Sequence, residues 1–329
     1  MIETMVWSEN EEIRTGISTA DLKDALTDEN RFVWVNIHDE PVESSRKMLM
    51  DVFDFHPLAI EDALEETHVP RIDDWGGYLY LVLRIMDPKQ DFNEEFRTRE
   101  LDVFINNNYI VTHQEHGNLA IEKVWRLVLR NPQHLGSTPV HLLYLILDAA
   151  ADDFIFAADK IDLIINELED RVFYDPDPKM LEVISTLKQG LMSLRQVIAP
   201  QREVLNKMAR GDYLILEEDS RLYFRDVYDH FHRLYEIIDS LRDLTGSTLE
   251  IYLSVVNNRM GNVMKTLTII TTLFMPISFL TGFFGMNFFQ PVMGATGWTN
   301  FTVFYIVLGI LLLLPVGMLI FISRRGWLK

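Results

Sequence analysis

The sequence contains no cysteine, and it has no acidic residue from Lys265 onward. The absence of cysteine excludes a disulfide-stabilised scaffold. All 49 acidic residues and 26 of the 30 basic residues lie before Lys265, so the first 264 residues carry a net charge of −23 and the remainder carries +4. An acidic body of this kind repels nucleic acid and attracts cations. The N-terminal residues 1–12 are acidic and have no apolar core, so we expect no secretory signal there.

Charged residues are entirely missing from Thr266 to Ser323. This run contains two apolar segments, "TLTIITTLFMPISFLTGFF" and "FTVFYIVLGILLLLPVGMLIFI", separated by a turn-rich loop. Each segment has about the ~20 residues that a helix needs to cross a bilayer. Lys265 precedes the first segment and Arg324 and Arg325 follow the second, which predicts that both termini are cytoplasmic. The alternative, a buried helical hairpin of a soluble protein, fits such a long uncharged run poorly.

Proline is missing between Pro200 and Pro276, and the sequence between them keeps a helical rhythm of apolar residues. That rhythm runs through Leu222, Val227, Phe231, Leu234, Ile238 and Leu241. We therefore predict one helix from about Asp219 to Gly285, in which a stalk continues into the first membrane span. Gly246 and Gly261 are expected to weaken this helix locally.

One side of the predicted helix carries small and polar residues, apart from two methionines. Steps of three and four residues join Glu250, Ser254, Asn257, Gly261, Met264, Thr268, Thr271, Met275, Ser278, Gly282 and Gly285. Two membrane helices cannot enclose an aqueous path, so conduction would need an oligomer in which this side of each helix faces the axis. The alternative is that the small residues only allow close helix packing.

The region before the stalk combines strands with helices. Residues 141–173 and 180–208 are helical in pattern and flank the proline turn "YDPDP", which predicts an antiparallel hairpin. Strand-like segments are "RFVWVNI", "YLYLVLRIM", "LDVFIN" and "YIVTHQ", and helix-like segments are "STADLKDAL", "SSRKMLMDVF" and "HPLAIEDALEE". The fold class is therefore α+β, with an α/β domain at 1–135, the hairpin and stalk at 136–264 and a membrane domain at 265–329.

Motifs of catalysis are missing. The sequence has no nucleophile motif, glycine-rich phosphate loop, HExxH motif or cysteine/histidine metal cluster. His38, His56, His113 and His230 are scattered, and we interpret them as ordinary surface or core histidines. We do not expect an enzyme.

Several motifs occur in an order that identifies a family. "HPLAIEDAL", "YFRDVYDH", "NVMKTLTIITTLFMP" and then "GMN" at Gly285–Asn287, between two terminal membrane spans, resemble the CorA family of magnesium channels over the whole chain. The resemblance implies a homopentamer with a cytoplasmic funnel in the cell (inner) membrane. It also implies passive flux of Mg²⁺, with Co²⁺ and Ni²⁺ as further ions, under the control of intracellular Mg²⁺.

The resemblance also implies functional residues at matching positions. The selectivity motif is Gly285, Met286 and Asn287, and the pore continues inward through Ser278, Met275, Thr271, Leu267 and Met264. An intersubunit metal-sensing pair corresponds to Asp62 on one subunit and Asp226 on the next, and a second divalent site to Glu61 and Asp148. The resemblance places Leu267 in the pore, whereas the pattern of residues spaced three and four apart placed Thr268 there.

Two departures from the family pattern stand out. The loop after GMN, "FFQPVMGATGWTN", lacks the usual acidic residue, and Gly261 stands where the family commonly has asparagine. Without the acidic residue, it is an open question whether the loop attracts external cations. With glycine at position 261, the oligomer lacks one ring of side chains that could contact ions. Two alternatives remain: a membrane-anchored metal-binding regulatory or scaffolding protein that does not conduct, and a zinc-preferring relative, whose motif more often has valine at the place of Met286.

Overall fold

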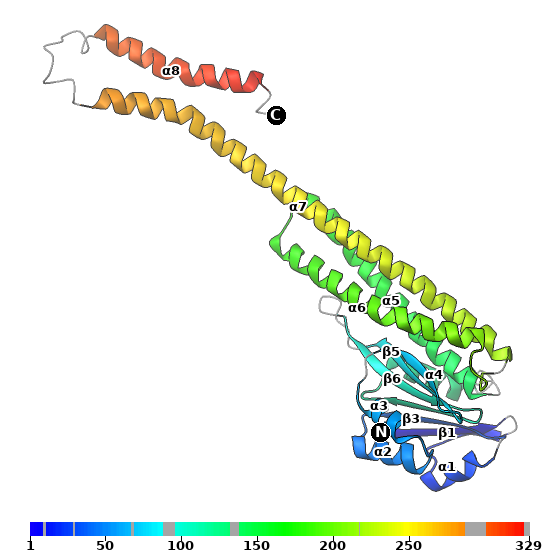
Figure 1. Ribbon diagram of the computed structural model, residues 1–329. Helices are drawn as coiled ribbons and strands as arrows, with labels where there is room; N and C mark the ends of the chain where they lie inside the picture. Colours follow the sequence, from blue (N-terminus) through cyan, green and yellow to red (C-terminus); the bar gives the residue numbers. More distant parts are fainter. Residues whose placement is uncertain are drawn as a thin grey trace. The chain divides into compact units, whose positions relative to one another are not determined.

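The computed structural model describes residues 1–8, 11–28, 30–66, 69–87, 96–131, 138–216, 218–286 and 301–325 (Figure 1). The chain divides into two compact units, Met1–Tyr252 and Leu253–Lys329. The first unit joins a mixed sheet and its helices to a set of long helices, and the second is helical throughout its described part. This architecture confirms the predicted α+β class.

A seven-stranded sheet forms the centre of the first unit, in the order β2-β1-β3-β7-β6-β5-β4. The strands are β1 (Ile2–Ser8), β2 (Glu11–Thr15), β3 (Phe32–His38), β4 (Arg71–Asp74), β5 (Leu79–Met86), β6 (Thr98–Ile105) and β7 (Tyr109–Gln114). Among the described strands, β3 pairs with β7 in parallel and the other five pairs are antiparallel. The four predicted strands are β3, β5, β6 and β7, and the asparagines at 106–108 form the predicted turn between β6 and β7.

Three short helices cover one face of this sheet: α1 (Thr19–Leu26), α2 (Val42–Asp51) and α3 (Pro57–Leu64) (Figure 1). Alternate strand residues such as Tyr80, Val82 and Phe104 pack with these helices in one buried cluster. Period-two alternation turns these side chains to the same face. The predicted helices in residues 18–66 are thereby confirmed, and α3 carries the predicted metal-site residues Glu61 and Asp62.

The other face of the sheet carries α4 (Leu119–Arg130) and the long helices α5 (Pro139–Tyr174) and α6 (Pro178–Arg210) (Figure 1). Both long helices begin with proline after a capping side chain, Thr138 for α5 and Asp177 for α6. Gln201 on α6 exchanges two hydrogen bonds with the backbone of Arg84 on β5, at 2.7 and 3.1 Å. The predicted hairpin is therefore fixed to the sheet at a buried point.

Helix α7 (Arg221–Gly285) contributes to both units and has 65 residues. It follows a 3₁₀ turn at Glu218–Ser220 and confirms the predicted continuity of the stalk with the first span. In the first unit its buried side is Phe224, Val227, Phe231, Leu234, Ile238, Leu241, Thr245, Thr248 and Tyr252. Leu222, which the apolar pattern included, is 74% exposed, because the buried stripe begins instead at Phe224.

The second unit contains the rest of α7 and helix α8 (Phe301–Arg324). Both helices are long and apolar enough to cross a membrane. Each contains an internal proline, Pro276 in α7 and Pro315 in α8. Asn287 and the loop up to residue 300 lie outside the described residues.

Candidate metal centre and membrane-spanning unit

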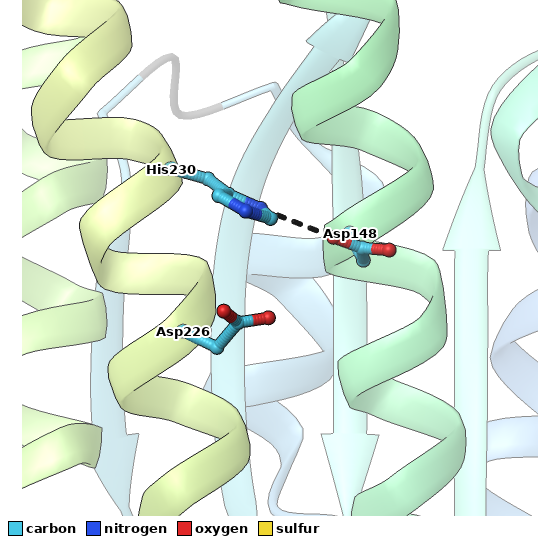
Figure 2. Close-up of side chains that lie close together, drawn as sticks. All are labelled: Asp148, Asp226 and His230. Carbon is cyan, nitrogen blue, oxygen red and sulfur yellow. Dashed lines mark ion pairs between the residues drawn. The ribbon is translucent and has the colours of Figure 1, made fainter.

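Two long helices of the first unit bring three metal-ligating side chains together. Asp148 projects from α5, and Asp226 and His230 project from α7 (Figure 2). One ligand atom from each residue lies within 4.8 Å of the others. Asp226 and His230 share a helix face because residues four apart lie one turn apart. The parallel packing of α5 and α7 thus collects ligands that are far apart in the sequence.

The negative charge of the two carboxylates in this cluster is only partly compensated by neighbouring groups. His230 Nδ1 lies 3.2 Å from Asp148 Oδ1, and the hydroxyl of Tyr144 donates a hydrogen bond to Asp226 Oδ2 at 3.3 Å. Burial raises the pKa of Asp148, and the carboxylates of Asp152 and Asp226 add to the rise, while His230 opposes it. Burial and the neighbouring carboxylates of Asp148 and Asp226 raise the pKa of Tyr144 to about 12. Negative charge at this point therefore lacks full compensation from the protein.

A divalent cation would relieve this repulsion. Two carboxylates supply the oxygen ligands that Mg²⁺ prefers, and the partial exposure of Asp148 and His230 leaves room for coordinated water. The imidazole adds a ligand that suits Co²⁺, Ni²⁺ and Zn²⁺ better than Mg²⁺. The residues present therefore fit a divalent ion.

The remaining predicted metal residues lie on α3. The carboxylate of Asp62 accepts a hydrogen bond from Arg71 Nη2 at 2.6 Å, and Glu61 is its exposed neighbour. Within the described chain, Asp148 and Asp226 come together, whereas Asp62 pairs with Arg71. The sequence pattern predicts an ordinary histidine at His230, but the structure places it in the cluster, and its spacing of four residues from Asp226 is the signal that could have indicated this.

In the second unit, α7 has two different sides. From 261 to 285 its partly buried residues are Lys265, Ile269, Leu273, Pro276, Ile277 and Leu280, and all the others are exposed. Ile269 and Lys265 share a cavity with residues of α8, so this apolar side faces α8. With 100° between successive residues, the predicted pore positions Leu267, Thr271, Met275 and Ser278 centre on the opposite side. Met275 is 71% exposed there, whereas Met264, 57% exposed, also lines the cavity shared with α8.

The end of α7 holds the first part of the selectivity motif. Gly285 is the last helical residue, and the backbone N–H of Met286 donates to the carbonyl of Phe283 at 3.4 Å. Along the predicted pore side, the hydroxyl of Thr271 donates to the carbonyl of Leu267 at 2.9 Å. Asn287, the third residue of the motif, lies outside the described residues.

Comparison with known proteins gives consistent matches. Residues 29–325 match the family described as CorA-like Mg²⁺ transporter protein. The chain is 32% identical to YfjQ of Bacillus subtilis, with 89% of each chain covered, and 30% identical to the cobalt/magnesium transport protein CorA of Thermotoga maritima, covering 99% of this chain and 92% of that one. It is 24% identical to the zinc transport protein ZntB of Cronobacter sakazakii, covering 93% and 90%.

A solved structure agrees on the fold. The complete structure of the CorA magnesium transporter from Methanocaldococcus jannaschii superposes with a TM-score of 0.83 at 22% identity, covering 99% of this chain and 98% of that one.

Proposed function

Because the chain belongs to the CorA-like Mg²⁺ transporter family, we propose that it is a channel that conducts Mg²⁺ passively across the cell (inner) membrane. We include Co²⁺ as a second transported ion, because the Thermotoga maritima relative is named as a cobalt/magnesium transport protein. The channel is a homopentamer with both termini in the cytoplasm. The α/β domain of residues 1–135 and the hairpin and stalk of 136–264 form its cytoplasmic part, and residues 265–329 form its membrane part.

The two-sided character of α7 carries this proposal. The side with Ile269, Leu273 and Ile277 is partly buried toward α8, while Leu267, Thr271, Met275 and Ser278 on the opposite side are exposed. In a ring of subunits this open side lines the axis, and α8 separates α7 from lipid. A helix that only anchored the protein would have no reason to keep the hydroxyl groups of Thr271 and Ser278 on the side away from its partner helix.

Selectivity in this proposal depends on the end of α7. Mg²⁺ holds its inner water shell tightly and dehydrates reluctantly. A ring of Asn287 amide oxygens accepts hydrogen bonds from those waters while remaining neutral. Gly285 ends the helix without a side chain and Met286 packs beside it, so that the motif forms the outer mouth.

Gating depends on the metal centre. Asp226 and Asp148 lie together on α7 and α5, and Asp62 and Glu61 of the neighbouring subunit complete the intersubunit sites. Bound Mg²⁺ neutralises carboxylates that otherwise repel across the interface. When cytoplasmic Mg²⁺ falls, its release loosens the ring and opens the path through α7.

The deciding experiment is Mg²⁺ flux into proteoliposomes that contain the purified full chain and an internal indicator dye. We expect flux that Asn287→Ala nearly abolishes without changing oligomer size, while Asn300→Ala at the other end of the same loop leaves flux at the wild-type level. An assembled protein without flux would contradict the channel and favour the non-conducting regulatory alternative. Wild-type flux in the Asn287→Ala variant would place the filter elsewhere.

A zinc-preferring transporter is the second candidate, favoured by His230 in the metal centre and by the similarity to a zinc transport protein. Imidazole binds Zn²⁺ more readily than Mg²⁺. The same proteoliposomes with a Zn²⁺ indicator decide between the two. Faster flux of Zn²⁺ than of Mg²⁺ at equal concentration would favour this candidate.

A further inference from the structure

The α3 side of the proposed intersubunit metal site already contains a cation that belongs to the protein. Asp62 on α3 accepts a hydrogen bond from Arg71 Nη2 at 2.6 Å. The same guanidinium donates from Nε to Asp73 Oδ2 at 3.0 Å. Arg71 is the first residue of β4, which lies at one edge of the sheet. The guanidinium therefore lies between a carboxylate of the helix and a carboxylate of its own strand.

This arginine is held in place and yet accessible. The side chains of Arg71, Asp62 and Asp73 are 31%, 42% and 44% exposed, so an ion from solution can reach all three. The guanidinium carbon lies over the buried ring of Tyr80, 5.9 Å from its centroid. Burial would lower the pKa of Arg71, but the carboxylates of Asp73 and Asp62 raise it above its usual value. Arg71 is therefore a permanent positive charge beside Asp62.

The other half of the proposed pair has no such charge bonded to it. The carboxylate of Asp226 accepts a hydrogen bond from the neutral hydroxyl of Tyr144 at 3.3 Å. The two carboxylates that would share Mg²⁺ across the interface thus differ, because Asp62 is bonded to a cation and Asp226 to a neutral group. A divalent ion that approaches Asp62 is repelled by the guanidinium, and it competes with the guanidinium for the carboxylate oxygens.

We propose that Arg71 competes with Mg²⁺ for Asp62 and so raises the Mg²⁺ concentration at which the ring of subunits closes. The inference rests on the gating role proposed for Asp62. Asp73 makes the exchange feasible, because it keeps one hydrogen bond to the guanidinium when Mg²⁺ takes Asp62. The site then alternates between two paired states, and neither state leaves a charged side chain without a partner. Arg71 thus sets the sensitivity of the site and is not itself a metal ligand.

The test measures Mg²⁺ binding to the detergent-solubilised full chain by isothermal titration calorimetry, together with protection of the stalk from limited proteolysis. Arg71→Gln should lower the Mg²⁺ concentration of half-maximal protection roughly fivefold, because it removes the competing charge. Arg71→Lys keeps that charge and should stay within about twofold of the wild-type value. Arg126→Gln removes the same charge from the exposed Arg126–Glu122 pair on α4 and should leave the value unchanged. A purely structural role for Arg71 predicts the opposite direction, since a loosened fold is cleaved more readily.

A double-mutant cycle tests whether the effect passes through Asp62. Asp62→Asn should raise the Mg²⁺ requirement, and Arg71→Gln added to Asp62→Asn should lower it no further. Equal effects of Arg71→Gln in both backgrounds, or no effect in the wild-type background, would overturn the competition. The gating role of Asp62 would survive that result, provided that Asp62→Asn has its expected effect. An unchanged Mg²⁺ requirement in Asp62→Asn would instead overturn both the gating role and the competition. Mg²⁺ flux is measured separately, so none of these outcomes decides whether the protein conducts.

Discussion

His230 Nδ1 on α7 lies 3.2 Å from Asp148 Oδ1 on α5, and the carboxylate of Asp226 completes the group one turn away from the histidine. This contact joins the stalk helix to the helical hairpin at a point of excess negative charge. Asp148 has a raised pKa because it is partly buried and because other carboxylates surround it. A cation bound here would stabilise the contact between α5 and α7, and its loss would weaken the contact at the base of the stalk.

Replacement of Asp226 by lysine tests the regulatory role of this cluster. Asp226→Lys places a tethered cation where the ion would bind, so we expect the variant to open with less dependence on internal Mg²⁺. Limited proteolysis of the stalk should no longer respond to Mg²⁺ at the concentration that protects the wild-type protein. Asp229→Lys, on the same helix and outside the cluster, is the matched control. Protection of the Asp226→Lys variant at the wild-type Mg²⁺ concentration would show that the assignment is wrong.

The imidazole of His230 predicts that the cluster binds Co²⁺ and Mg²⁺ with different dependence on this residue. His230→Ala removes a nitrogen ligand that contributes more to Co²⁺ than to Mg²⁺ binding. We expect the Co²⁺ concentration that protects the stalk from protease to rise about tenfold, while the corresponding Mg²⁺ concentration changes less than about threefold. His232→Ala, whose ring lies 3.5 Å from Glu236 instead, should change neither. Equal shifts for both metals would indicate that His230 only supports packing.

The sequence predicted the elements whose patterns are long or regular. The uncharged run predicted the two membrane-spanning segments of α7 and α8, and the absence of proline between Pro200 and Pro276 predicted the length of α7. Runs of β-branched and aromatic residues predicted the four strands β3, β5, β6 and β7. Hydrophobic periodicity is strongest in such segments. β1 was missed because acidic and polar residues flank its buried centre at Met5 and Val6, and β4 was missed because it has only four residues and ends in two aspartates.

The candidate site was less accessible to sequence reasoning. Asp148 and Asp226 are 78 residues apart, and their contact depends on how α5 and α7 pack, which periodicity does not specify. The sequence suggested that each was a metal residue only through the family resemblance, and it gave no indication that His230 joined them. The partial burial that raises the pKa of Asp148 likewise arises from tertiary packing.

A close approach between α6 and the β5–β6 region gives a stability prediction. A Cβ atom at Gly190 would lie 1.8 Å from the ring of the buried Phe96, so this ring occupies the space that any side chain would need. Gly190→Ala should therefore destabilise the first unit by about 1–3 kcal/mol. Gly246→Ala in α7 meets open space and should stabilise its helix by about 0.5–1 kcal/mol. Urea unfolding followed by tryptophan fluorescence measures both; destabilisation of the same size in the two variants would contradict this account.

The buried carboxyl of Asp102 gives a prediction for pH. Burial, with Glu100 nearby, raises its pKa to about 6, although His113 and the hydroxyl of Tyr80 oppose the rise. Arg84 also lies in this network, 3.5 Å from Glu100. Because the folded-state pKa exceeds the unfolded value of 3.8, the folded protein binds the proton more tightly. The stabilisation from this proton is complete below the unfolded pKa and is lost as pH rises through about 6.

Asp102→Asn removes this titration and keeps an acceptor for the Tyr80 hydroxyl. Relative to the variant, the free energy of unfolding of the wild-type protein should fall by roughly 2 kcal/mol as pH rises from about 4 to about 7. Urea unfolding across that range measures the difference, with Asp51→Asn at an exposed position as the control. Parallel pH profiles for the wild-type protein and Asp102→Asn would mean that Asp102 does not titrate in this range.

The last prediction concerns closure of the proposed pore. Met264, Leu267 and Met275 are exposed residues of α7, and Met275, on the side away from α8, is 71% exposed in the single chain. In a ring of subunits, thioether and methyl groups offer a hydrated divalent ion no replacement for its waters, so a narrow apolar constriction blocks conduction by dewetting. Met275→Ser replaces that surface with hydroxyl groups and should increase Mg²⁺ leak severalfold at high internal Mg²⁺, when the wild-type channel is closed. Ile270→Ser, at an exposed position about 100° around the helix from the centre of the predicted pore side, should leave the leak unchanged. Dye-loaded proteoliposomes with Mg²⁺ on both sides measure this closed-state flux, and size-exclusion chromatography confirms that each variant assembles. If Met275→Ser closes as tightly as the wild-type channel, the hydrophobic gate is not at this ring, and Met275 packs against a neighbouring helix instead.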